Sequence, residues 1–156
     1  MAIRRRLLAS RPDTPTVVGV ALVAFLYAAS LFCPAFEFRF DERQHVLSGW
    51  EALIFLPRCV AFIDAISQMH LVLAWLPNVL LLVGVAGLLL GSRRTALLAS
   101  AFALLGGLYM PGYFLYPSDS TFVLGAGYYL WMASMAVLAG LSQVGERGGG
   151  GPALRG

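Results

Sequence analysis

The sequence has very little charge and contains no lysine. Only 12% of its 156 residues are charged and 59% are hydrophobic, whereas a soluble domain has about 25% charged residues. A chain with so little charge cannot cover a water-facing surface, so the composition indicates an integral membrane protein. It also excludes a nucleic-acid-binding domain, because the basic residues lie in short segments between hydrophobic runs rather than on one face.

Residue sets that carry catalysis or hold a cofactor are also missing. No serine has the histidine and carboxylate setting of a nucleophile elbow, and there is no glycine-rich phosphate loop. The two histidines are isolated from each other in the sequence, which does not favour a haem or metal site. We therefore expect no enzyme activity, no catalytic residues, no cofactor and no bound metal.

Four hydrophobic runs are long enough to cross a membrane as helices, since a bilayer core of about 30 Å needs roughly 20 apolar residues. None contains Asp, Glu, Lys, Arg or His, and ion pathways and most intramembrane catalysis need such residues. The runs cover residues 16–32, 71–90, 95–113 and 121–141. The predicted fold class is an all-α integral membrane protein, with a four-helix transmembrane domain over residues 1–144 and a flexible cytoplasmic tail over residues 145–156.

Charge is distributed unequally between the segments that connect these runs. The segments before the first run, between the second and third, and after the fourth hold eight arginines and two acidic residues; the other segments hold three arginines and six acidic residues. Short basic loops stay in the cytoplasm, so we expect both termini to be cytoplasmic and residues 33–70 to form an outer loop. The use of arginine alone, with many glycines, favours a GC-rich bacterial genome and therefore a multi-pass protein of the bacterial inner membrane. A cleaved signal is the alternative, because Arg4 to Leu8 before an apolar run is similar to a twin-arginine signal.

The predicted outer loop carries most of the polar variety of the chain. Residues 37–41 alternate charged and aromatic side chains, which is typical of a short extended stretch. Residues 46–56 are apolar except for Ser48 and Glu51 and are too few to span a bilayer, so they predict an interfacial or re-entrant helix. Specific function is most often carried by such loops.

The two cysteines, Cys33 and Cys59, both fall in this loop. In an oxidising compartment they would pair readily and close a loop of about 27 residues. The sequence equally allows both thiols to be unpaired and buried at the membrane edge. Their spacing is not C-x-x-C, so a redox-active role is the weaker third interpretation.

Polar side chains within the hydrophobic runs form a second candidate site. Asn78 is the only asparagine and follows Pro77, whose missing amide kinks a helix. We expect Asn78 to repair the kink or to reach Tyr128, Tyr129 or Ser134 on a facing helix. The polar tips of Tyr128, Tyr129 and Trp131 also need partners, which Ser134, Asn78 or a carbonyl freed near Pro77 could supply. A site for a small molecule, a lipid or a quinone is the functional interpretation. Its residues would be Trp75, Asn78, Tyr128 and Tyr129.

Small residues at four-residue spacing predict close packing between the helices. Gly87 and Gly91 form a G-x-x-x-G at the end of the second run. Such a motif supports either packing within the chain or association with a second copy.

Three short strings resemble a loose group of uncharacterised small bacterial inner-membrane proteins with four spans: Ser48-Gly49-Trp50-Glu51, Ala74 to Asn78, and Gly127 to Ser134. The resemblance implies that fold and implies no activity. We therefore expect a non-enzymatic accessory or interaction protein whose outer loop contacts a partner or the membrane surface. Its partners would be the lipid bilayer and a membrane protein or second copy, with no nucleic acid. The alternative is a protein that binds a small molecule, lipid or quinone, or a subunit of a membrane redox complex.

The charge distribution predicts the outcome of a topology experiment. A reporter that is active only outside the cytoplasm should be active when fused after Asp119 and silent when fused after Arg94 or Arg155. The opposite pattern of reporter activity in intact cells would contradict the orientation.

Overall fold

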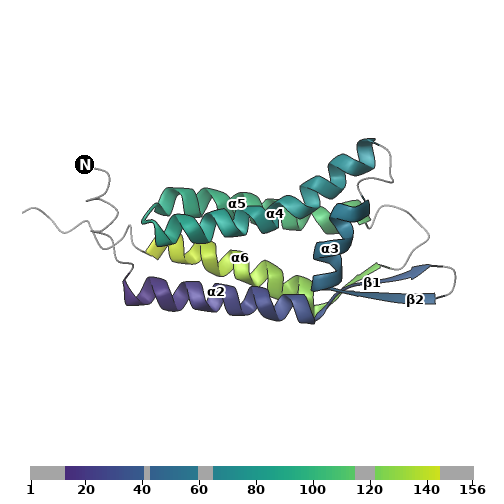
Figure 1. Cartoon of the computed structure of the whole chain (residues 1–156), viewed down its shortest axis with the longest axis horizontal. Coiled ribbons are helices and arrows are strands. Elements are labelled where there is room, and N and C mark those ends of the chain that lie inside the picture. The colour runs from purple at the N-terminus through teal and green to yellow at the C-terminus, as the bar shows by residue number, and fades with distance from the viewer. Residues whose placement is uncertain (1–12, 41–42, 60–64, 115–121, 145–156) are drawn as a thin grey trace, which may run out of the picture.

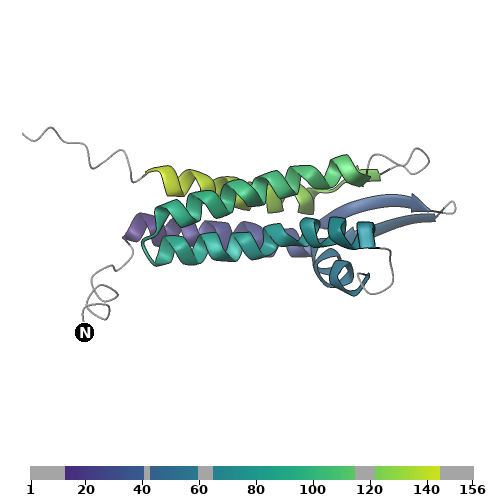
Figure 2. The ribbon, with the colours of Figure 1, turned by 90° about the horizontal axis from the view of Figure 1, so that it is seen from above.

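The computed structural model describes residues 13–40, 43–59, 65–114 and 122–144, which are mostly helical. Four long helices run side by side along the long axis of the molecule (Figures 1 and 2). They are α2 (Thr14–Phe32), α4 (Ala65–Leu89), α5 (Arg93–Phe114) and α6 (Ala126–Val144). Each predicted hydrophobic run therefore overlaps one long helix, with bounds that differ by up to six residues. The predicted tail over residues 145–156 and the arginines before residue 13 lie outside the described residues.

A small sheet and a short helix lie together at one end of the long helices (Figure 1). Strand β1 (Pro34–Phe40) pairs with β2 (Arg43–Ser48) on one side and with β3 (Phe122–Leu124) on the other, and both pairings are antiparallel. Helix α3 (Gly49–Cys59) follows β2 and contacts α2 and α4. We call β1, β2, β3 and α3 the end platform. The turn between α4 and α5 lies at the opposite end (Figure 1).

The end platform corrects the expectation of an all-α fold. The extended stretch expected over residues 37–41 is longer and becomes the central strand β1. The start of the fourth predicted run is not helical, because residues 122–124 pair with β1 and the Gly125 N–H donates to the Ala35 carbonyl at 2.9 Å. Aromatic and β-branched residues such as Phe122 and Val123 favour strands. A run assigned by its hydrophobicity alone does not separate these residues from the helix that follows.

The helix expected over residues 46–56 begins later, at Gly49, because residues 46–48 belong to β2. A reciprocal cap fixes this start. The Glu51 N–H donates to Ser48 Oγ at 3.2 Å, while Glu51 Oε2 accepts from both the Ser48 N–H and its hydroxyl at 2.8 Å. This is a capping box. The hydrogen bond from the Ser48 backbone, followed by that from its hydroxyl, lowers the pKa of the Glu51 carboxyl.

The turn between α4 and α5 depends on a glycine in the left-handed region. Gly91 has a φ of 74°, and the Ser92 N–H donates to the Gly87 carbonyl at 2.7 Å, as in a Schellman motif. A Cβ added to Gly87 would lie 3.1 Å from the Ala96 nitrogen at the start of α5. Both glycines of the G-x-x-x-G are therefore needed for this turn within one chain. The four-residue spacing alone does not distinguish this role from association between two chains.

Three other glycines, at or near the starts of α3 and α6, lie against the backbone where α2 ends and β1 begins. A Cβ added to Gly127 would lie 2.7 Å from the Cys33 carbonyl oxygen and 2.9 Å from that of Ser30. At Gly49 and Gly125 it would come still closer to backbone carbonyls of residues 30 and 34. A backbone cannot move aside as the end of a flexible side chain can, so these contacts hold the starts of α3 and α6 against α2.

The interior contains a few hydroxyl groups that are satisfied within their own helices. Each donates to the carbonyl three residues earlier, at 2.6 to 3.0 Å. They belong to the buried serines Ser30, Ser100, Ser134 and Ser142. Within the described part of the chain, no buried side-chain nitrogen or oxygen lacks a partner. The buried hydroxyl groups therefore need no charged partner.

Two helices in the described part of the chain are long and apolar enough to cross a membrane. They are α2 and residues Val72–Leu89 of α4. Only 17% and 33% of these stretches are buried inside the molecule, whereas a core helix of a soluble protein is mostly buried.

Two glycines of α6 provide a matched test of the packing. Gly127→Ala should lower the free energy of unfolding by about 1 to 3 kcal/mol, because the new methyl group overlaps backbone atoms. Gly140→Ala should be neutral or stabilising by up to about 1 kcal/mol, since a Cβ there meets nothing within 4 Å. Thermal unfolding in detergent measures both, and equal effects would contradict the close approach of α6 to α2.

Candidate functional site

Asn78 joins three of the four long helices through its side-chain amide. Its Oδ1 accepts a hydrogen bond from the Tyr27 hydroxyl of α2 at 3.2 Å and another from Trp131 Nε1 of α6 at 3.0 Å. Its Nδ2 donates to the Trp75 carbonyl of its own helix at 3.2 Å. We call Asn78, Tyr27 and Trp131 the Asn78 junction.

Pro77 sets the position of the junction. Pro77 is buried within α4, and it supplies no amide to the Leu73 carbonyl one turn earlier. The Asn78 amide donates to Trp75 instead, so it does not repair that missing bond. Pro77 packs against Gly106 of α5, where an added Cβ would lie 2.8 Å from its Cγ. Proline therefore brings α4 and α5 together, while Asn78 contacts α2 and α6.

The structure supports part of what the sequence predicts for Asn78. It bonds across to facing helices, and it is the one of three possible acceptors that the Trp131 N–H takes. Tyr128, which was named as a partner of Asn78, donates to Gly107 instead, and Tyr27 was not predicted as a partner. Tyr27 lies in a run whose neighbours are apolar, and a lone tyrosine carries no spacing signal. Ser134 was another candidate partner, yet its hydroxyl donates to the Trp131 carbonyl.

The two tyrosines of the predicted ligand site have different surroundings. Tyr128 is buried, and its hydroxyl donates to the Gly107 carbonyl of α5 at 3.0 Å. Its ring lies 6.2 Å from that of Phe36 of β1 and 6.0 Å from that of Trp131, so it links the end platform to α6. Tyr129 is 60% exposed and touches only the edge of this cluster, in a T-shaped contact with Tyr128.

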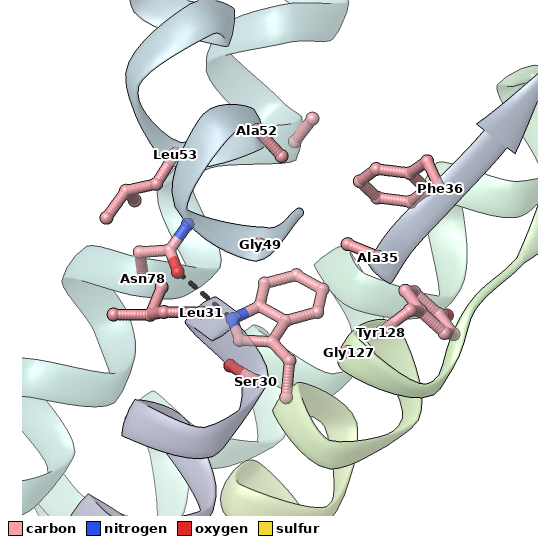
Figure 3. A pocket seen from close by; sticks show the side chains of 12 residues that line it. Ser30, Leu31, Ala35, Phe36, Gly49, Ala52, Leu53, Asn78, Gly127 and Tyr128 are labelled. Atoms are coloured by element: carbon pink, nitrogen blue, oxygen red, sulfur yellow. Dashed lines mark hydrogen bonds between the residues drawn. The ribbon is translucent and has the colours of Figure 1, made fainter. Parts of the chain in front are cut away.

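A small pocket opens beside the Asn78 junction, where α2, α3, α4, α6 and β1 meet (Figure 3). Its volume is about 50 Å³, which is room for a few waters or a group of about four atoms and far less than a drug-sized site of about 300 Å³ or more. Asn78 and Tyr128 belong to its wall, whereas Trp75 and Tyr129 do not. The structure thus brings together two of the four predicted site residues and adds Trp131.

The pocket wall is neutral. No Asp, Glu, Lys, Arg, His or Cys lines it, and its polar side chains are those of Ser30, Asn78, Tyr128 and Trp131. Such a set can form hydrogen bonds, but it has no base to activate Ser30 and no group that exchanges protons near pH 7. The arrangement can therefore form hydrogen bonds with a neutral ligand.

The other predicted site is the cysteine pair. Cys33 is half-buried with a free thiol, and the side chain of Cys59 lies outside the described part of the chain. Cys33 is thus unpaired in this structure, and its pairing with Cys59 in an oxidising compartment stays a prediction. Among the residues that the structure describes, no group of three or more His, Cys, Asp or Glu side chains could hold a metal ion.

Comparisons with protein-family models, with curated proteins and with solved structures find no match to this chain. The function is therefore argued from the junction, the pocket and the end platform.

The Asn78 junction predicts a measurable coupling between helices. Asn78→Leu should lower the free energy of unfolding by about 1 kcal/mol or slightly more, because two hydrogen bonds between helices are lost and each is worth roughly 0.6 kcal/mol inside a membrane. Tyr27→Phe should lower it by less in the wild-type background and have no effect in the Asn78→Leu background. Tyr129→Phe is the control. Additive effects of the Asn78 and Tyr27 changes in detergent unfolding would show that the bond does not form.

Proposed function

We propose that this protein is a non-enzymatic, four-span protein of the bacterial inner membrane, with both termini in the cytoplasm. On this proposal the end platform lies outside the cytoplasm and contacts a partner. The whole protein functions as an accessory or interaction protein. Its long helices anchor it in the membrane, and its end platform is the contact surface.

Large apolar side chains face outward on each of the long helices, and this supports insertion of all four. Phe25 of α2 is 69% exposed, Leu82 of α4 is 66% exposed, and Leu105 of α5 is 63% exposed. Soluble monomers rarely expose contiguous apolar patches larger than a few hundred Å². A lipid environment would cover such surfaces on α5 and α6 as well as on α2 and α4.

Charge at the two ends supports the orientation. Arg93 and Arg94 begin α5 at the turn with α4, and Asp13 caps α2 by accepting the Thr16 N–H at 3.2 Å. Arg93 is among the groups that lower the pKa of Asp13, after the hydrogen bond from Thr16. The platform at the other end mixes both signs of charge, with Glu37 and Glu51 as well as Arg39, Arg43 and Arg58. Arginine at the turn end matches a cytoplasmic position.

The fixed attachment of the end platform is the observation that carries the proposal. The hairpin of β1 and β2 extends past the ends of the long helices (Figure 1), yet its base is held by the glycine contacts to α2 and by the capping box of α3. Val46 of β2 is 48% exposed and Trp50 of α3 is 53% exposed. Exposed apolar side chains on a rigid polar element are typical of a binding surface.

Copurification from a mild detergent tests the contact. A protein partner should be recovered with the wild-type chain and lost, or strongly reduced, with Val46→Asp and with Trp50→Ala, because both side chains belong to the proposed contact surface. Val144→Asp, at an exposed position at the other end of α6, is the matched control and should retain the partner. Equal recovery with all three variants, each integrated into membranes like the wild type, would contradict a contact through the end platform.

A further inference from the structure

The hydrogen bonds around the pocket leave one donor available to a ligand. The Tyr128 hydroxyl donates to Gly107, the Ser30 hydroxyl to Tyr27, and the Trp131 N–H to Asn78. Asn78 Nδ2 carries two hydrogens, and the bond to Trp75 uses one of them. A hydrogen-bond acceptor that enters the pocket therefore meets a free side-chain donor.

The rest of the wall defines the size and charge of that group. Leu53 lies beside the Asn78 amide, and Ala52 and Phe36 provide apolar surface farther along the wall (Figure 3). No charged residue lies in the wall, so an anion such as phosphate would lose its hydration without a compensating charge. A volume of about 50 Å³ admits a few atoms and leaves the remainder of any larger molecule outside. The occupant is therefore a small neutral acceptor at the end of an apolar body.

The pocket lies near the platform end of the long helices. Ser30 is close to the end of α2, Tyr128 is in the first turn of α6, and Asn78 is six residues after Val72, or about 9 Å along the helix. If the proposed membrane orientation holds, this depth lies beneath the outer headgroups, where ester carbonyls of lipids and the head of a quinone reside.

We infer that this pocket binds an uncharged carbonyl group of a membrane molecule. The free N–H of Asn78 donates a hydrogen bond to the carbonyl oxygen. Two molecules present that chemistry: a phospholipid, by its acyl ester, and a quinone, by its ring carbonyl. The inference rests on the proposed membrane location and assigns a ligand class to the site beside Asn78.

A comparison of ligands with and without the carbonyl tests the inference. The protein is purified in dodecyl maltoside, which has no carbonyl group, with Trp50→Phe and Trp75→Phe so that Trp131 is the only tryptophan. Fluorescence of Trp131 is followed during titration with a diester phosphatidylglycerol, with its diether analogue, and with decylubiquinone. One hydrogen bond should make the diester bind about three- to tenfold more tightly than the diether. A saturable response to decylubiquinone instead would support the carbonyl site with a quinone as its source.

Variants that fill the pocket separate specific binding from partition into the micelle. Ala52→Leu should abolish the saturable response, whereas Ala136→Leu, at an exposed position of α6, should preserve it. Leu53→Phe is a second filling variant in case Ala52→Leu unfolds, and an unchanged far-ultraviolet circular dichroism spectrum without ligand shows that the fold is intact.

Equal affinity for diester and diether together with an unsaturable quinone response would overturn the inference and leave a water-filled pocket. Retention of binding in a folded filling variant would overturn it as well. Membrane integration is measured separately by alkaline extraction of membranes. Failure of that assay would contradict the proposed function, whereas failure of the titration alone would contradict the carbonyl site.

Discussion

The side-chain oxygen of Asn78 joins three helices near the platform end of this molecule. Asn78 Oδ1 accepts hydrogen bonds from α2 and from α6 while its own residue belongs to α4, so three helices share a single acceptor. Apolar surfaces alone leave helices free to slide or rotate inside a lipid phase, where there is little hydrophobic drive between them. A shared acceptor has one position that satisfies both donors, and it therefore fixes the relative depth of the three helices.

The end platform depends on that arrangement. Gly49 and Gly127 lie against the backbone at the end of α2, and Gly125 lies against that of Pro34 in β1. Such contacts form only when α2 and α6 are at the correct depth. Tyr128 then joins α6 to both α5 and β1, through its hydroxyl and its ring. The pocket beside Asn78 is the space that remains where these elements meet (Figure 3). Packing, platform and candidate ligand site thus follow from a common set of contacts.

The sequence predicts the long helices well, because twenty-residue apolar runs and an absence of charge are strong signals. It predicts that Asn78 is important, because a single asparagine beside a proline within an apolar run stands out. The sheet was missed in part because β3 has three residues inside a continuous apolar run, and strand pairing is a contact between distant segments. The capping box was readable from Ser48 and Glu51, since S-x-x-E before an apolar run is its usual pattern. Tyr27 and the glycine contacts could not be read from spacing, because they depend on which helix faces which.

The central claim is that the end platform is a fixed structure and not a loose loop. Hydrogen–deuterium exchange of the intact protein in lipid nanodiscs tests it most directly, with residues 36–38 of β1 as the segment to follow. These residues pair with both β2 and β3, so the account predicts that their amides exchange slowly, as those in the middle of α6 do. Exchange at the rate of an unstructured peptide would contradict it.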